Sequence, residues 1–162
     1  MAQISSSPRY ETLREELAAQ FPSGIDAFCG TVGGAGMVMG VSCVLKSKWP
    51  DTRVVVLEPA ACPVTTEGRT GSRSVEGKGI GFVPPHLDSK LYDEVRGISE
   101  AEGRARCTRL AREEDLLVGT STALNVVAAI ALAKERGPGK TVVTVAVYTG
   151  LKYMNGNLLV DA

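Results

Sequence analysis

The sequence predicts a three-layer α/β/α domain built on a mostly parallel sheet of four strands. Short apolar segments of strand length alternate with longer segments whose apolar residues recur at helical spacing. One strand-like segment, residues 53–57, is an unbroken run of mainly β-branched residues, which is typical of a strand covered on both faces. Because alternating strands and helices connect through right-handed crossovers, this order favours parallel strands with helices on both sides of the sheet.

Residues that start and stop helices define the individual elements. Leu13 and Leu17 have helical spacing, and Pro22–Gly24 breaks that pattern. Ser99–Glu102 matches a capping box and therefore predicts the start of a helix. The expected elements are helices over 8–20, 37–48, 99–114 and 122–135, and strands over 25–29, 53–57, 116–118 and 141–147. Residues 1–162 are expected to form one domain, with an N-terminal helical segment over 1–22.

Composition and charge argue against several classes of function. Lys plus Arg and Asp plus Glu number 18 each, and no like-charged run exceeds three residues. The sequence therefore lacks the cluster of positive charge that binds nucleic acid or anionic lipid. Four cysteines without CxxC spacing and a single histidine predict no metal site. The sequence has neither the apolar core of a signal peptide nor a run of transmembrane length. We therefore expect a cytoplasmic protein with small-molecule or protein partners and no membrane association.

A glycine-rich turn over residues 30–36 joins a predicted strand to a predicted helix. Free amides and the positive end of the helix dipole form an anion site at such a helix start, and glycines let a phosphate approach the backbone. Alternatively, the turn only packs the helix close to its strand. It matches neither a Walker A sequence nor a GxGxxG with a ribose-binding acid, which disfavours nucleotides. Residues 58–91 form a long excursion rich in Gly, Pro, Ser and Thr, where a site is also expected.

Three further sequence blocks follow the turn in order: Val56–Ala60, Val75–Pro84 and Leu116–Thr122. Together with the turn they resemble the cysteine synthase and cystathionine β-synthase group of fold-type II enzymes, which use pyridoxal phosphate (PLP) and are similar to tryptophan synthase β. The resemblance covers about residues 24–153 and implies the carboxy-terminal half of that architecture. The family's amino-terminal half, with its Schiff-base lysine and its loop for the substrate carboxylate, is not recognisable in this sequence.

The resemblance implies a set of cofactor-binding residues. The family's Gly-Thr-Gly-Gly-Thr phosphate cup falls on Gly33, Gly34, Ala35, Gly36 and Met37. Gly34 and Met37 thus replace residues with hydroxyl groups. Because each lost hydrogen bond to a phosphate is worth roughly 1.5–3 kcal/mol, weaker binding of PLP is expected.

Two hydroxyl residues outside the cup complete this set. Ser121 matches the family's serine that faces the pyridine nitrogen, a neutral partner suited to β-elimination and β-replacement. Alternatively, or in addition, Ser121 is the N-cap of the helix that follows. Thr149 keeps the hydroxyl that follows the last strand in the family.

Lys78, Ser121 and Tyr148 are the candidate catalytic residues. Lys78 stands where the family commonly has an apolar residue on the substrate side of the cofactor. A lysine in a partly desolvated cleft can have a lowered pKa and act as a base or Schiff-base amine, whereas the alternative is an exposed loop lysine. Tyr148 replaces an acidic residue of the family. His86, beside the same loop, is either a general base or a surface imidazole.

Three functions remain open. The first is a truncated, cysteine-synthase-like chain that forms one half of a PLP-dependent lyase or transferase acting on an amino acid, with a complementary N-terminal-half protein as partner. The second is a stand-alone enzyme that reuses the cleft without PLP. The third is a non-catalytic binding or scaffold subunit. In every case the missing half exposes apolar surface at the sheet edge, so a homodimer or a hetero-complex is expected.

Overall fold

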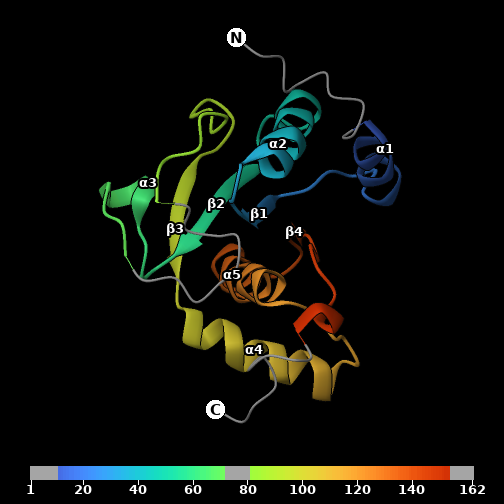
Figure 1. Cartoon of the computed structure of the whole chain (residues 1–162). Helices are drawn as coiled ribbons and strands as arrows, with labels where there is room; N and C mark the ends of the chain where they lie inside the picture. Colours follow the sequence, from blue (N-terminus) through green and yellow to red (C-terminus); the bar gives the residue numbers. More distant parts are fainter. Residues whose placement is uncertain (1–10, 72–80, 154–162) are drawn as a thin grey trace.

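The computed structural model describes residues 11–71 and 81–153, whose elements alternate along the chain (Figure 1). The elements in the first range are α1 (Glu11–Gln20), β1 (Ala27–Thr31), α2 (Gly36–Lys48), β2 (Arg53–Pro59) and α3 (Val64–Glu67). Those in the second range are β3 (Glu94–Ile98), α4 (Glu100–Glu113), α5 (Thr120–Arg136), β4 (Val142–Thr144) and the 3-10 helix η3 (Gly150–Tyr153). The predicted helices and three of the four predicted strands are therefore found, with shifted ends.

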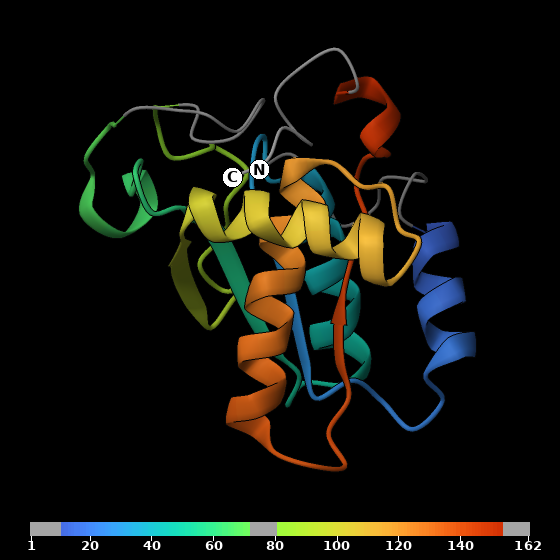
Figure 2. The same cartoon turned by 90° about the horizontal axis from the view of Figure 1, so that it is seen from below.

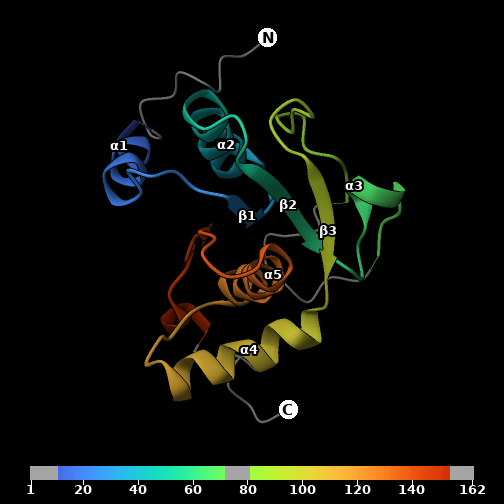
Figure 3. The same cartoon turned by 180° about the vertical axis from the view of Figure 1, so that it is seen from behind.

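The four strands form one parallel sheet in the order β3-β2-β1-β4. Helix α2 lies on one face, and α5 lies on the other with α4 packed outside it (Figures 1 and 2). Figure 3 shows α3 beyond the β3 edge of the sheet. This arrangement confirms the predicted α/β fold. Within the described residues, no helix combines the length and apolar character of a membrane-spanning segment.

Alternating side chains of β1 and β2 fill two separate cores. Phe28 and Val56 pack with Met39 and other apolar residues of α2 on one face of the sheet. Cys29 and Leu57 pack with α5 on the opposite face. All these residues are inaccessible to solvent, which explains why the central strands read as continuous apolar runs rather than as alternating ones.

The prediction of a strand over 116–118 is wrong. The fourth strand of the sheet is β3 instead. In the 116–118 segment only Val118 makes an isolated bridge, to Thr149. Its neighbour Leu116 is 53% exposed, so the apolar run does not form a buried strand. Strand β3 escaped prediction because charged side chains interrupt it, and these are held by ion pairs rather than by burial among apolar groups.

The two edges of the sheet differ in chemistry. On β3, Arg96 contacts the carboxylates of both Glu94 and Glu135, and Glu94 also contacts Arg53. Hydrogen bonds from Arg96 in particular hold the pKa of Glu94 below its ordinary value, so this edge stays charged at neutral pH. On the opposite edge, β4 has only partly buried residues and is one of the shortest elements described, with Val142–Thr144. Charges discourage further strand pairing at β3, whereas β4 presents no such barrier.

Replacing Asp115 with glycine should raise the free energy of unfolding by about 1 kcal/mol. Asp115 follows α4 with a φ of 57°, a left-handed conformation in which a Cβ atom is unfavourable. Its side chain is exposed, so the substitution removes no buried contact. Urea denaturation can measure the gain. Glu114→Gly is the matched control, because residue 114 has a φ of −126° and should lose stability. Equal effects at both positions would contradict this explanation.

Candidate functional site: the carboxyl end of the sheet

The glycine-rich turn lies at the carboxyl end of the sheet and leads from β1 into α2. Ala35 is the N-cap of α2 and has a left-handed backbone, with a φ of 64° and a ψ of −9°. No side chain accepts a hydrogen bond as cap at this helix start. Because the first amides of a helix lack partners within the helix, this end can bind an anion.

A cavity of about 230 Å³ opens in front of this turn. All five residues of the predicted phosphate cup, Gly33–Met37, line it. Tyr148 and Val147, which follow β4, form another part of the wall, and Thr31 at the end of β1 contributes a hydroxyl residue. The structure therefore brings the predicted cup and Tyr148 together, although they are more than a hundred residues apart in the sequence.

Asn125 of α5 fixes the relative position of the two walls. Its side chain is fully buried, and its Oδ1 accepts a hydrogen bond of 2.8 Å from the backbone amide of Thr31. Its Nδ2 donates to the carbonyl oxygen of Val145 at 2.9 Å. One amide group thus links the end of β1 to the segment that leads to Tyr148. No motif singled out Asn125, which is the one polar residue in the stretch Ala123–Ala133 of α5.

Ser121 lies one helical turn before Asn125, on the same side of α5. Its side chain is 1% exposed, and its Oγ has no hydrogen-bond partner. The interpretation of Ser121 as an N-cap is wrong, because Gly119 occupies that position and α5 begins at Thr120. A buried hydroxyl without a partner is costly, so this polar atom at the start of α5 is unusual. Ser121 is not among the residues that line the cavity beside Gly33–Met37.

The segment after β4 is attached to the start of α5. The amide of Gly119 donates to the carbonyl of Tyr148 at 3.0 Å, and a Cβ atom at residue 119 would lie 2.6 Å from Cε2 of Tyr153. The Tyr148 ring is 49% exposed and lies 5.2 Å from Nζ of Lys152. Thr149 does not line the cavity, and its hydroxyl accepts a hydrogen bond from the amide of Leu151. The predicted roles of Tyr148 and Thr149 stay predictions.

Lys78 lies outside the described residues, so its predicted role also stays a prediction. His86 is exposed. No lysine is among the residues that line the cavity in the part of the chain that the structure describes.

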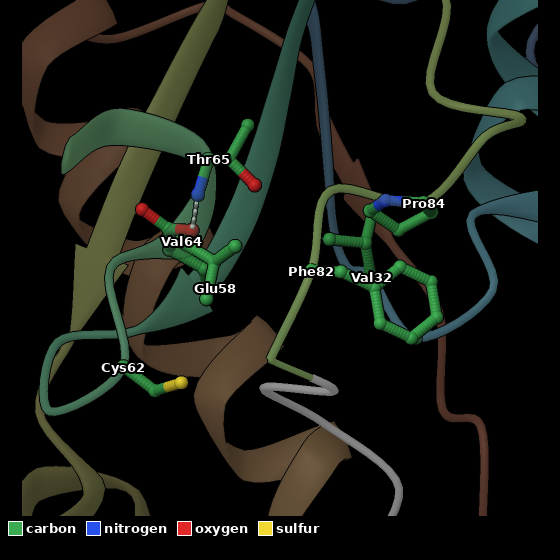
Figure 4. A pocket seen from close by; sticks show the side chains of 8 residues that line it. Val32, Glu58, Cys62, Val64, Thr65, Phe82 and Pro84 are labelled. Carbon is green, nitrogen blue, oxygen red and sulfur yellow. Dashed lines mark hydrogen bonds between the residues drawn. The ribbon is translucent and has the colours of Figure 1, made fainter. Parts of the chain in front are cut away.

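A second, smaller pocket of about 20 Å³ lies between the glycine-rich turn and residues 58–65 (Figure 4). Its lining includes Glu58, Thr65 and Phe82. Glu58 is only 3% exposed, and its carboxylate accepts hydrogen bonds from the amides of Thr65 and Thr66 and from the Thr66 hydroxyl. Glu58 therefore supplies the cap of α3, which has no cap from Pro63. The sequence placed Glu58 in a family block without predicting this role.

Cys29, also near this end, is not an activated thiol. Burial raises its pKa to about 11, and its Sγ lies 3.7 Å from the carbonyl oxygen of Asn125, to which it donates. A thiol with this pKa is protonated at neutral pH and is a poor nucleophile. We assign it to the core between β1 and α5.

The fold and the site define an α/β protein with a cavity at the carboxyl end of parallel strands, in front of a helix start that has no side-chain cap. A family model described as pyridoxal-phosphate dependent enzyme matches residues 7–147. The chain therefore belongs to the family of pyridoxal-phosphate dependent enzymes.

Individual relatives agree with this assignment. A cysteine synthase of Staphylococcus aureus (strain N315) is 39% identical over 145 residues, which are 89% of this chain and 47% of that protein. A probable cysteine synthase of Bacillus subtilis (strain 168) is 38% identical over 134 residues, or 83% of this chain and 43% of that protein. The chain thus spans about half the length of these relatives.

Solved structures show the same relation. O-ureido-L-serine synthase has a TM-score of 0.89 and 28% identity, and the match covers 99% of this chain and 53% of that chain. O-acetylserine dependent cystathionine β-synthase from Helicobacter pylori has a TM-score of 0.84 and 29% identity, covering 92% and 48%. The resemblance to one half of a fold-type II enzyme of the cysteine synthase group is confirmed.

Two features of the structure fit PLP. The helix start beside Gly33–Met37 has no side-chain cap, which suits a phosphate group, and the buried hydroxyl of Ser121 has no protein partner. Both features lie at the carboxyl end of the sheet.

Proposed function

We propose that this chain is the phosphate-binding half of a PLP-dependent enzyme that carries out β-elimination or β-replacement on an amino acid. The observation that carries the proposal is the buried, unpaired hydroxyl of Ser121, at the same end of the sheet as the cavity beside Gly33–Met37. The relatives that are similar over this length are cysteine synthases. Their names support the choice of reaction class.

In this proposal the residues of the chain bind and orient rather than transfer protons to carbon. The helix start at Gly36 neutralises part of the phosphate charge. The Ser121 hydroxyl would donate to the ring nitrogen, a neutral partner that would leave the nitrogen without a full positive charge. When bound, PLP supplies the electron sink for bond breaking at the amino acid. A complementary N-terminal-half protein supplies the Schiff-base lysine and the contacts to the substrate carboxylate.

The β4 edge supports the need for a partner. Its three residues are only partly buried, and the chain spans about half the length of its relatives. A strand of the complementary half could pair with this edge and cover it. A second copy of the chain is the alternative occupant, as in a homodimer.

Mixing the chain with the N-terminal half of a relative tests the proposal. The mixture should bind PLP with an absorbance band near the visible range and should turn over an amino-acid substrate. Replacing Ser121 with alanine should weaken PLP binding to the mixture by roughly two- to tenfold, the value of one hydrogen bond. The stability of the chain alone should not fall, because the hydroxyl has no protein partner to lose.

Ser47→Ala is the control, since Ser47 is an exposed residue of α2 away from the turn. Absence of the band with complementary halves from several relatives would overturn the proposal. An unchanged PLP affinity in Ser121→Ala would remove the role given to Ser121.

A non-catalytic binding subunit is the second candidate. It is favoured by Gly34 and Met37, which bring no hydroxyl to the cup. In that case the chain would form a stable complex with a partner, but the complex would show neither the absorbance band nor turnover.

A further inference from the structure

A groove of about 400 Å³ lies between α4 and α5, and we call it the α4/α5 groove. No described residue lines both this groove and the cavity beside Gly33–Met37. Helix α4 crosses α5 on the side of α5 that faces away from the sheet (Figure 2), so the groove belongs to the outer helical layer. Its apolar lining comes from Ala105 of α4 and from Val127, Ile130 and Ala131 of α5.

The apolar part of this lining is only partly covered by the chain. Val127, Ile130 and Ala131 are half-buried, and Ala105 is exposed. Val127 packs at the margin of the core between α5 and the sheet, whereas Ile130 is in none of the core clusters found among the described residues. Because covering apolar surface in a concave site is favourable, the groove suits an occupant with apolar side chains.

The charged part of the lining is mainly positive. Arg106, Arg109 and Lys134 line the groove, and Glu102 is the acidic residue that they face in the described chain. Arg109 forms an ion pair of 2.7 Å with Glu113. Arg106 and Lys134 have no hydrogen-bond or ion-pair partner within the described residues. The whole chain has equal numbers of acidic and basic residues, so this positive surplus is local and is complementary to an acidic occupant.

Apolar surface between flanking cations selects among possible occupants. A groove between two helices accepts an amphipathic helix, whose apolar face lies in the groove. A second copy packed through the same groove would bring the same cations together across a twofold axis, which is unfavourable. Single-stranded nucleic acid stacks its bases on aromatic rings, and no aromatic residue lines the groove in the part of the chain that the structure describes.

We propose that the α4/α5 groove binds an acidic amphipathic helix of a partner protein. Apolar side chains one turn apart on that helix contact Val127 and Ile130, and its carboxylates pair with Arg106 and Lys134. This surface is separate from the site of the proposed function. Binding here requires neither PLP nor a complementary half.

Fluorescence anisotropy of two labelled peptides, titrated with the whole chain, tests the proposal. Both peptides are helices of about 16 residues, stapled so that they are equally helical, with leucine at every third or fourth position. One has glutamate at the flanking positions and the other has lysine. The glutamate peptide should bind saturably and at least about tenfold more tightly than the lysine peptide, and added salt should weaken its binding.

Charge reversal in the groove should reverse this preference. The double variant Arg106→Glu, Lys134→Glu should bind the glutamate peptide roughly tenfold more weakly than wild type and the lysine peptide more tightly. Ile130→Ala should weaken binding of the glutamate peptide about fivefold, because it removes apolar surface. The matched control, Arg69→Glu with Lys90→Glu, makes the same change in net charge at exposed residues that do not line the groove. It should bind both peptides as wild type does.

Three results would overturn the proposal: no saturable binding of the glutamate peptide to wild type, equal binding of the two peptides, or the same loss in the control variant. A dimer in sedimentation that the Arg106→Glu, Lys134→Glu variant disrupts would assign the groove to a second copy instead. Circular dichroism should give each variant the helix content of wild type, so that lost binding is not lost folding. The chain is used alone and without PLP, so failure here leaves the proposed function intact, and absence of the absorbance band leaves this proposal intact.

Discussion

Asn125→Leu should lower the free energy of unfolding by about 3 kcal/mol, one of the two largest effects that we expect. Leucine has the same number and branching of side-chain heavy atoms but can neither accept from the amide of Thr31 nor donate to the carbonyl of Val145. Both backbone groups would then be buried without a partner, and each such group costs about 1–3 kcal/mol. Urea denaturation monitored by circular dichroism measures the change.

Leu124→Met provides the comparison for Asn125→Leu. Leu124 is the neighbouring residue of α5 and is likewise fully buried, and a swap of similar volume should cost less than about 1.5 kcal/mol. Under the proposed function, the Asn125 variant should also bind PLP more weakly in the mixture with a complementary half, because the walls that carry Thr31 and Tyr148 are no longer linked. A loss of stability in Asn125→Leu no greater than that in Leu124→Met would contradict the prediction. It would mean that the two backbone groups find water as a partner without cost.

Glu58→Leu should remove the cap of α3 and so destabilise the start of this helix. Hydrogen exchange at the amides of Thr65 and Thr66 should become about 30-fold faster. The Glu58 carboxylate accepts from both amides and from the Thr66 hydroxyl, at 2.7, 3.2 and 2.6 Å. Hydrogen bonds to a charged group contribute roughly 1.5–3 kcal/mol, and about 2 kcal/mol corresponds to this acceleration. Leucine offers no acceptor, so both amides lose their partner.

The control for Glu58→Leu is Glu67→Gln in the same helix. Glu67 is an exposed residue whose carboxylate pairs with Arg69, and exposed ion pairs contribute little. Exchange at Thr65 and Thr66 should hardly change in this variant. Similar acceleration in both variants would mean that the turn opens independently of Glu58.

Local patterns were enough to predict the centre of the fold. The runs that form β1 and β2 are buried on both faces of the sheet, so nearly every residue in them is apolar and the strands can be predicted from composition. The start of α4 was also predicted correctly, since Ser99 is its N-cap and accepts from the amide of Glu102. These features depend on residues close together in the sequence.

Features that depend on distant residues could not be predicted. Strand β3 is held by the contacts of Arg96 with Glu135 and of Glu94 with Arg53, which lie about forty residues apart in sequence. The apolar run at 116–118 looked like a strand, but Leu117 accepts from the amide of Gly150 in an irregular connection. Whether a hydroxyl such as that of Ser121 has a partner depends on the assembled fold, and no sequence pattern reports it.

The left-handed backbone of Ala35 bears on how the proposed phosphate site would select its ligand. Alanine in this conformation costs about 1–2 kcal/mol, and it is retained because the residue is 4% exposed and its carbonyl accepts the first hydrogen bond of α2, from Met39. The turn thus has its shape before any ligand arrives. Under the proposed function, a turn that is already shaped would spend little binding energy on rearrangement, and it would select a phosphate group by size and geometry rather than adapt to it.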